Sequence, residues 1–329
     1  MKKTIQNILR VGLPMAFGGA ILWWMYRGFD WQEIQEAVSV DMRWSWMLLS
    51  LPFGILAQVL RGLRWRQMLE PMGEKPRRLT CVNAVFLSYG SSLVVPRVGE
   101  LLRCGVLSHY EGTRMSRAVG TVVTERIVDV VLILLLSAVT LLSQIPVFMR
   151  FMNRTGMSLE TILSRFTPTG YMVTLVCGLT VMLMAIYLLR RFHFFDRSQQ
   201  TVRGLLDGLL SIRHIRNKSL FWLYSIGIWV CYFFHFFLTF YCFSYTEHLG
   251  PMEALVTFVL FTYAVLVPTP NGAGPWHFAT KTVLMLYGVD GNEGAMFALI
   301  VHSVQTLLVA GLGVAGALAL VVAGRNRKL

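Results

Sequence analysis

Two segments decide how this chain folds, SSLVVPRVGELLRC at residues 91–104 and AVLVPTPNGAGPW at residues 264–276. Each segment ends an apolar run that is short for a membrane span, and a second apolar run follows after a break rich in proline and glycine. Proline removes a backbone donor and glycine loosens a helix. Each unit is therefore either a kinked span or a hairpin that enters and leaves by the same face.

The composition around these breaks is that of a membrane protein. Of 329 residues, 55% are apolar and only 14% are charged, against about 25% charged in soluble domains. A spanning helix needs about 20 mainly apolar residues. The candidate segments are 8–26, 44–63, 80–95, 118–144, 170–189, 219–245, 253–267 and 293–322. A soluble enzyme is excluded, and the first run is interpreted as a retained helix rather than a secretory signal because no polar flank follows it.

The distribution of basic residues favours hairpins over kinked spans. The chain carries 30 lysines and arginines against 17 acidic residues, a formal net charge of +13. If both broken units are hairpins, 23 basic residues lie inside and 5 outside; if both span, the division is 15 to 13, and Arg126 and Lys281, at membrane depth, are counted on neither side. Because cytoplasmic loops carry the basic excess, the hairpin topology with both termini cytoplasmic is preferred. The charge then reflects topology and contact with anionic lipid, and not nucleic acid.

The predicted fold is an all-α polytopic membrane protein with six full spans and two re-entrant or broken helical hairpins, forming one transmembrane domain over residues 1–329. The order helix, helix, hairpin, helix occurs in 8–144 and again, from the opposite side, in 170–322. This order predicts an inverted repeat, which is a common transporter construction. Since lipid-exposed broken backbone is not tolerated, both hairpins must be buried in protein or line a cavity.

Charged residues at membrane depth form the first candidate binding site. Each costs about 2.5–3.5 kcal/mol on insertion scales, and guanidinium groups suit phosphate. The set is Arg97, Glu100, Arg103, Glu125, Arg126 and Asp129. We expect Arg97 and Arg103 to contact phosphate, with Glu100 and Asp129 orienting them. The alternative is an internal ion-pair network that closes the hairpin onto helix 118–144.

The second break supplies the other candidate residues. Asn271, Gly272 and Gly274 are expected to leave backbone amides free to approach a ligand, and His277 and Lys281 lie four residues apart on the following helix. The alternative for His277 is a hydrogen-bonded residue at the helix start.

Other polar and small residues receive structural interpretations. The cluster Arg61, Arg64 and Arg66 predicts interfacial anchoring, with phospholipid headgroup binding as the sharper alternative. His302 and Gln305 predict hydrogen bonds between helices. The Gly311-x-Gly313-x-x-Gly316 pattern predicts close helix packing, since no strand precedes it. The aromatic residues of 221–243 are expected to face lipid or a lipid-tail groove, and the five cysteines are expected to be reduced packing residues.

Catalytic and metal signatures do not occur in the sequence. It contains no HExxH, GxSxG or P-loop motif and no metal-ligand spacing of cysteine and histidine. We therefore expect no cofactor, no metal and no enzymatic activity.

The motifs PRVGELLR (96–103), TERIVD (124–129) and PTPNGAG (268–274) resemble those of the lysylphosphatidylglycerol synthase membrane-domain family of flippase-like proteins. The resemblance covers essentially the whole chain, and it implies a bacterial inner-membrane protein. The best-understood members move aminoacylated phospholipid between leaflets, and a separate soluble transferase domain makes that lipid. Asn271 stands where the family commonly has glycine, and His277 where it commonly has glutamate. This chain is expected to lack the soluble domain and to depend on another protein for any synthesis.

The sequence thus predicts an inner-membrane transporter for a phosphate-bearing lipid, aminoacylated or polyprenyl, whose tails stay in the bilayer. Two alternatives remain open at this point. One is an intramembrane transferase or hydrolase acting on a lipid headgroup, with His277 or Glu100 as general base. The other is a membrane partner that recruits a soluble lipid-modifying enzyme through its basic inner surface.

Overall fold

The structure is a computed structural model that describes residues 15–28, 31–95, 98–155, 214–267 and 269–325. Within these ranges every regular element is a helix. The chain divides into two compact units, one formed by residues 1–136 and 204–329 and the other by residues 137–203. The first unit holds nearly all of the described residues, and the account below concerns that unit.

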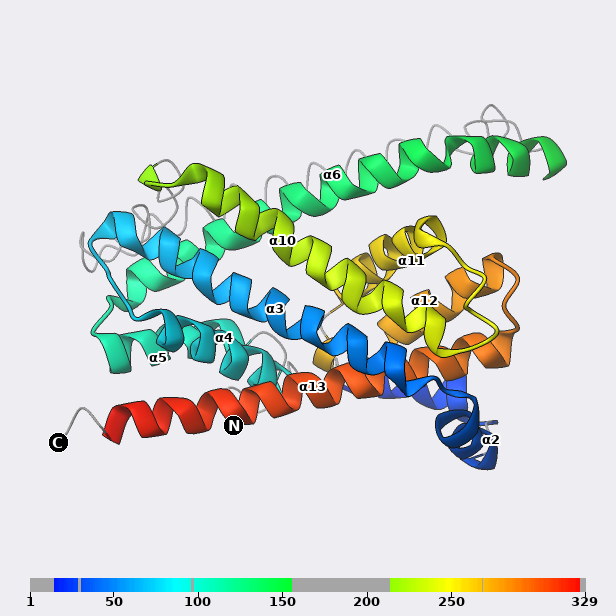
Figure 1. The fold of residues 1–329 in the computed structure, drawn as a ribbon, viewed down its shortest axis with the longest axis horizontal. Coiled ribbons are helices and arrows are strands. Elements are labelled where there is room, and N and C mark those ends of the chain that lie inside the picture. Colours follow the sequence, from blue (N-terminus) through cyan, green and yellow to red (C-terminus); the bar gives the residue numbers. More distant parts are fainter. Residues whose placement is uncertain (1–14, 29–30, 96–97, 156–213, 268, 326–329) are drawn as a thin grey trace, which may run out of the picture. The chain divides into compact units, whose positions relative to one another are not determined.

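The described helices fall into two series along the chain (Figure 1). The first series is a helix at Met15–Tyr26, α2 (Trp31–Glu36), the π-helix η1 (Ala37–Asp41), α3 (Trp44–Leu69), the short η2 (Glu70–Met72), α4 (Arg78–Ser92), α5 (Val98–Glu111) and α6 (Met115–Thr155). The second is α10 (Lys218–Phe237), η4 (Leu238–Cys242), α11 (Pro251–Ala264), η5 (Pro270–Gly272), α12 (Pro275–Leu286) and α13 (Gly291–Arg325).

Four helical segments are long and apolar enough to cross a membrane. They are Trp44–Met72, Met115–Gln144, Lys218–Cys242 and Gly291–Gly324, and each overlaps a predicted span. Two shorter apolar helices, Met15–Tyr26 and Pro251–Ala264, overlap two more. The protein is therefore an all-helical, multi-pass membrane protein. The predicted span 170–189 lies outside the described residues, and the count of six full spans and the cytoplasmic termini stay predictions.

The helices are interrupted at both predicted breaks. α4 ends at Ser92 and α5 begins at Val98, while α11 ends at Ala264 and α12 begins at Pro275. α3 and α10 run in opposite directions, the α4–α5 pair lies near the end of α3, and the α11–α12 pair lies near the end of α10 (Figure 1). Re-entry of these pairs into the membrane and the inverted repeat of 8–144 and 170–322 stay predictions.

Small residues let the first hairpin pack tightly against α13. A Cβ atom on Gly90 of α4 would lie 2.7 Å from the Cα atom of Gly313, and one on Gly316 would lie 2.8 Å from the carbonyl oxygen of Asn83. The prediction of close helix packing is confirmed for Gly313 and Gly316. Gly311 has open space around its Cα atom and takes no part in the contact.

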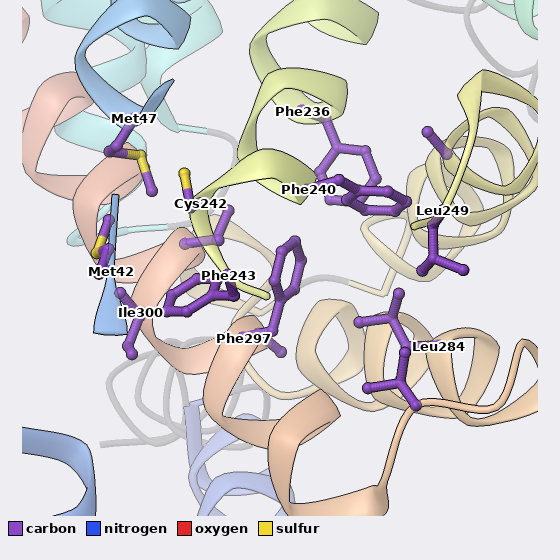
Figure 2. Packing of buried hydrophobic residues seen from close by; sticks show 14 of the residues in the cluster. Met42, Met47, Phe236, Phe240, Cys242, Phe243, Leu249, Leu284, Phe297 and Ile300 are labelled. Atoms are coloured by element: carbon purple, nitrogen blue, oxygen red, sulfur yellow. The ribbon is translucent and has the colours of Figure 1, made fainter. Parts of the chain in front are cut away.

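An aromatic core fills the space among α10, η4, α11 and α13. Figure 2 shows Phe240, Phe243 and Phe297 gathered there, with ring centres 5.5 Å and 5.9 Å from Phe297. The expectation that the aromatic residues of 221–243 face lipid or a lipid-tail groove is wrong for Phe236, Phe240 and Phe243, which are buried in this core. It holds for others, such as Trp222, which is 43% exposed.

The cysteines of the described ranges are packing residues. Cys81, Cys104, Cys231 and Cys242 are buried free thiols, as the sequence predicts. Cys177 lies outside the described residues.

Candidate functional site

Two arginines of α3 and two carboxylates of α6 form the centre of a buried ionic cluster. Arg61 Nη1 lies 2.8 Å from Glu125 Oε1 and 2.8 Å from Asp129 Oδ2. Arg64 Nη2 lies 3.0 Å from Glu125 Oε1 and 2.8 Å from Asp129 Oδ1. The spacings of three residues on α3 and four on α6 put each pair on one helix face. Each arginine therefore bridges both carboxylates and joins α3 to α6.

The first hairpin attaches to this cluster through Arg103 of α5. Arg103 Nη2 lies 2.8 Å from Glu125 Oε2, and the guanidinium carbon lies 4.7 Å from the centre of the Trp65 ring. Trp65 Nε1 in turn donates a hydrogen bond of 2.9 Å to Thr121 Oγ1. The Glu125 carboxylate, fully buried, thus receives three arginines. Removing it would leave buried positive charges uncompensated.

Arg126 and Glu100 form the accessible edge of the cluster. Arg126 Nε lies 2.8 Å from Glu100 Oε1, an ion pair without hydrogen-bond geometry, and Arg126 Nη1 lies 3.4 Å from Asp129 Oδ2. The two side chains are 40% and 38% exposed, whereas the other members are nearly inaccessible. The described cluster contains four arginines and three carboxylates, so its formal net charge is +1.

The cluster corrects several expectations. Arg61 and Arg64 are not interfacial anchors, because their side chains are only 4% and 0% exposed. Arg103 is 1% exposed and only its Nη2 contacts Glu125. Its Nε and Nη1 have no hydrogen-bond partner but are buried, so a phosphate cannot reach them in this arrangement. Glu100 and Asp129 do not orient Arg103. The ion-pair network that closes the hairpin onto the following helix is the arrangement observed.

Arg97, the other expected phosphate contact, lies outside the described residues. Its place in the hairpin stays a prediction.

A cavity of about 280 Å³ lies beside the cluster, among α3, α4, α10, α11, η5, α12 and α13. Most of its wall is apolar and aromatic, with Trp229, Phe236, Phe258, Phe261 and Trp276 among the lining residues. Its polar lining consists of Gln58, Tyr89, Tyr232, His235, Thr262, Asn271, His302 and Gln305. Tyr89 comes from the first hairpin and Asn271 from the second, so both hairpins contribute to one wall. The cavity can hold a small polar group with apolar surroundings.

Two tyrosines separate this cavity from the ionic cluster. The guanidinium carbon of Arg61 lies 5.7 Å from the ring centre of Tyr89 and 5.8 Å from that of Tyr232, within cation–π range. Gln58 Nε2 donates a hydrogen bond of 3.2 Å to the hydroxyl of Tyr232. Tyr89 and Tyr232 line the cavity and Arg61 does not. The Arg61 guanidinium therefore lies against two aromatic rings that belong to the cavity wall.

The loop of the second hairpin uses its own backbone donors. The Gly272 amide donates to the Thr269 carbonyl at 3.1 Å, the Ala273 amide to the Pro270 carbonyl at 2.9 Å, and the Gly274 amide to His277 Nδ1 at 3.4 Å. The expectation that amides of this loop stay free for a ligand is wrong for these positions. The positive φ angles of Gly272 (73°) and Gly274 (90°) serve instead to close the turn.

Of the residues expected on the second wall, only Asn271 lines the cavity. Its Nδ2 donates to Thr306 Oγ1 at 2.7 Å, and its carbonyl oxygen lies 3.1 Å from His302 Nε2. His277 is buried and caps the start of α12, which is the alternative interpretation of that residue. Lys281 is partly exposed and does not line the cavity.

His302 and Gln305 connect helices as predicted. His302 reaches the Asn271 backbone, and Gln305 Nε2 donates to the His235 carbonyl at 3.3 Å. Both also line the cavity, which the sequence did not indicate. Gln58 and Tyr89 were missed, and Tyr232 was assigned with the other aromatic residues of 221–243 to lipid or a lipid-tail groove, although polar groups within apolar helices are a usual sign of function. Among the described residues, no group of three or more metal-ligating side chains comes together.

Comparisons with known proteins give one match. The model of the family described as lysylphosphatidylglycerol synthase TM region matches residues 11–313. No curated protein and no solved structure matches the chain.

Proposed function

Because the chain belongs to the lysylphosphatidylglycerol synthase TM region family, we propose that it translocates a lipid with a phosphate-bearing headgroup across the bacterial inner membrane. The family connects this multi-pass membrane protein with lipid handling. Three points go beyond this family relation and belong to the proposal: that the protein transports the lipid, that the lipid headgroup bears phosphate, and that the membrane is the bacterial inner membrane.

The observation that carries the proposal is a largely apolar, aromatic-walled cavity with several polar groups in its lining, to which both hairpins contribute. Tyr89 of α4 and Asn271 of η5 line it together with residues of the long helices α3, α10 and α13. Its volume of about 280 Å³ is at the small end of ligand pockets. That size suits a headgroup whose tails remain in the bilayer, and it does not suit a whole lipid.

The ionic cluster supplies the electrostatic part of the proposal. Its charge of +1 lies behind Tyr89 and Tyr232, where the low dielectric constant strengthens its attraction for an anion. Gln58 Oε1 and Trp229 Nε1 are buried, have no hydrogen-bond partner among the described residues and belong to side chains that line the cavity, so they can accept from and donate to a headgroup. Arg126 and Glu100, at the accessible edge, and Arg97 are the candidates for direct contact with the headgroup during its passage.

A pair of identical substitutions on α13 tests the cavity as the route. Leu308 lines the cavity, whereas the adjacent Leu307 is 70% exposed and does not. We expect L308W to fill the cavity and L307W to leave it open. The assay is translocation of fluorescent phosphatidylglycerol in proteoliposomes, measured by dithionite quenching, with thermal unfolding as the control for folding. A tenfold or greater loss of rate in L308W alone supports the proposal. Wild-type rates in a folded L308W protein refute it.

We also propose that the chain performs no chemical step on the lipid. The two suggested general bases are engaged in this structure, since His277 accepts the Gly274 amide and Glu100 pairs with Arg126. Thin-layer chromatography of labelled phosphatidylglycerol recovered after translocation should show unchanged lipid. A new lipid species formed by the purified protein would establish the transferase or hydrolase alternative.

A further inference from the structure

A second pocket, also of about 280 Å³, lies where α3 ends and where α4 and α10 begin. These helix ends gather at one end of the unit in Figure 1. Arg66, Arg78 and Arg216 line the pocket, and Glu70 is the one carboxylate among its lining residues. The pocket therefore has a formal excess of two positive charges. It shares no lining residue with the central cavity.

The three arginines differ in how far they are already engaged. Arg66 Nε donates to the Pro76 carbonyl at 2.9 Å, and its Nη1 lies 3.0 Å from Glu70 Oε1. These contacts fix Arg66 in the wall and neutralise it. Arg78 and Arg216 are exposed and pair with no carboxylate in the part of the chain that the structure describes. Two cations that face one pocket without a counter-charge favour an anion between them, and guanidinium groups bind phosphate oxygens particularly well.

The remaining lining fits a group that is polar at one end and apolar at the other. Gln67 has a buried side-chain oxygen without a hydrogen-bond partner, which can accept from a hydroxyl or ammonium group. The start of α10 lies at the pocket, and its positive dipole end favours an anion. Leu63 and Leu220, from two helices long enough to span the membrane, supply apolar surface on the same wall.

We propose that this pocket, formed by Arg66, Arg78 and Arg216, binds a phosphate-bearing anionic group. Two sources share that chemistry, namely the headgroup of an anionic glycerophospholipid and a soluble phosphate ester. The predicted topology puts residues 61–78 and 190–218 on the cytoplasmic side, where anionic lipid attracts basic pockets between helices. The site is separate from the translocation cavity, so the proposal does not depend on transport.

Matched double variants test the pocket without using transport. R78Q/R216Q removes the two unpaired cations, and R77Q/K218Q removes two neighbouring charges that do not line the pocket. Binding is measured on delipidated full-length protein in neutral detergent, by thermal unfolding and native mass spectrometry. The probes are dioleoylphosphatidylglycerol, dioleoylphosphatidylcholine and glycerol 3-phosphate.

We expect R78Q/R216Q to lose at least tenfold in apparent affinity for an anionic probe, because hydrogen bonds to charged groups are strong. R77Q/K218Q should stay within twofold of wild type. Loss for phosphatidylglycerol alone identifies a lipid site, and loss for glycerol 3-phosphate as well identifies a site for soluble phosphate esters; both support the proposal. Unchanged affinity in R78Q/R216Q, or equal loss in both double variants, overturns it. If R78Q/R216Q does not fold, the single variant R216Q against K218Q decides in the same way.

Discussion

Replacing Glu125 by glutamine tests whether one carboxylate holds three helices together. The substitution keeps the size of the side chain but removes the negative charge that lies 2.8 Å, 3.0 Å and 2.8 Å from Arg61, Arg64 and Arg103. The formal charge of the cluster then rises from +1 to +2. Only Asp129 and the partly exposed Glu100 remain to compensate it.

The expected loss of stability is large because the site is dry. Glu125 is fully buried, and removing one partner of a buried ion pair costs about 3–5 kcal/mol. The matched control is E247Q, since Glu247 also pairs with an arginine, Arg43, but both side chains are substantially exposed. Exposed pairs contribute only about 0–1 kcal/mol. The difference between the two variants measures the effect of burial on the ion pair.

The measurement is the free energy of unfolding of the purified protein in mixed micelles, obtained by titration with a denaturing detergent. The double variant R103Q/E125Q completes a mutant cycle with the two single variants. Because R103Q removes one of the uncompensated charges, the double variant should be more stable than the sum of the single effects by about 0.5–3 kcal/mol. If E125Q destabilises the protein no more than E247Q does, the cluster does not hold α3, α5 and α6 together.

Three further outcomes follow from the packing of the hairpins and the cavity. G90V should destabilise the protein by about 1–3 kcal/mol, since its Cβ atom would meet the α13 backbone at 2.7 Å. The control is G311V, whose side chain enters open space. Equal free energies of unfolding in the two variants would contradict this packing. G272A should lower the free energy of unfolding by about 1 kcal/mol more than G288A does, because both glycines have positive φ but only a Cβ at residue 272 would meet a side chain. A larger loss of stability in G288A would count against this reasoning. Y232F removes a hydroxyl from the cavity wall and should slow lipid translocation severalfold while changing stability by about 1 kcal/mol; an unaltered rate in the proteoliposome assay would argue against a role for that hydroxyl.

Much of the fold follows from the sequence because lipid imposes strong constraints on it. Long apolar runs had to become helices, and the proline- and glycine-rich segments predicted the interruptions that follow Ser92 and Ala264. Close helix packing at Gly313 and Gly316 could also be predicted, since the glycine pattern lies in an apolar run with no preceding strand, but the sequence did not identify α4 as the partner. Phe236, Phe240 and Phe243 were misassigned because hydrophobicity alone does not distinguish a lipid-facing ring from one buried in a protein core.

The site was less predictable because it depends on contacts between distant segments. Sequence spacing put Glu125 and Asp129 on one face, but it could not show that the partners on that face come from Arg61 and Arg64, more than sixty positions earlier. In the sequence, a basic cluster near the end of a span has the pattern of an interfacial anchor. That pattern is the same whether the arginines face water or a buried carboxylate. Similarly, Tyr89 and Tyr232 become neighbours of one arginine only when α4 and α10 are both in place.

Stability alone does not account for an ionic cluster of this kind. Buried ion pairs can often be replaced by apolar residues of similar volume without loss of stability, so apolar side chains could have joined α3, α5 and α6 equally well. Apolar side chains could not place an unbalanced positive charge behind the two tyrosines of the cavity wall. Four arginines against three carboxylates leave one positive charge unbalanced. Glu125 and Asp129 hold Arg61, which carries part of that charge, at the faces of the two tyrosine rings. The composition of the cluster is therefore explained by the anion that the cavity is proposed to receive, and its geometry by the need to keep that charge fixed.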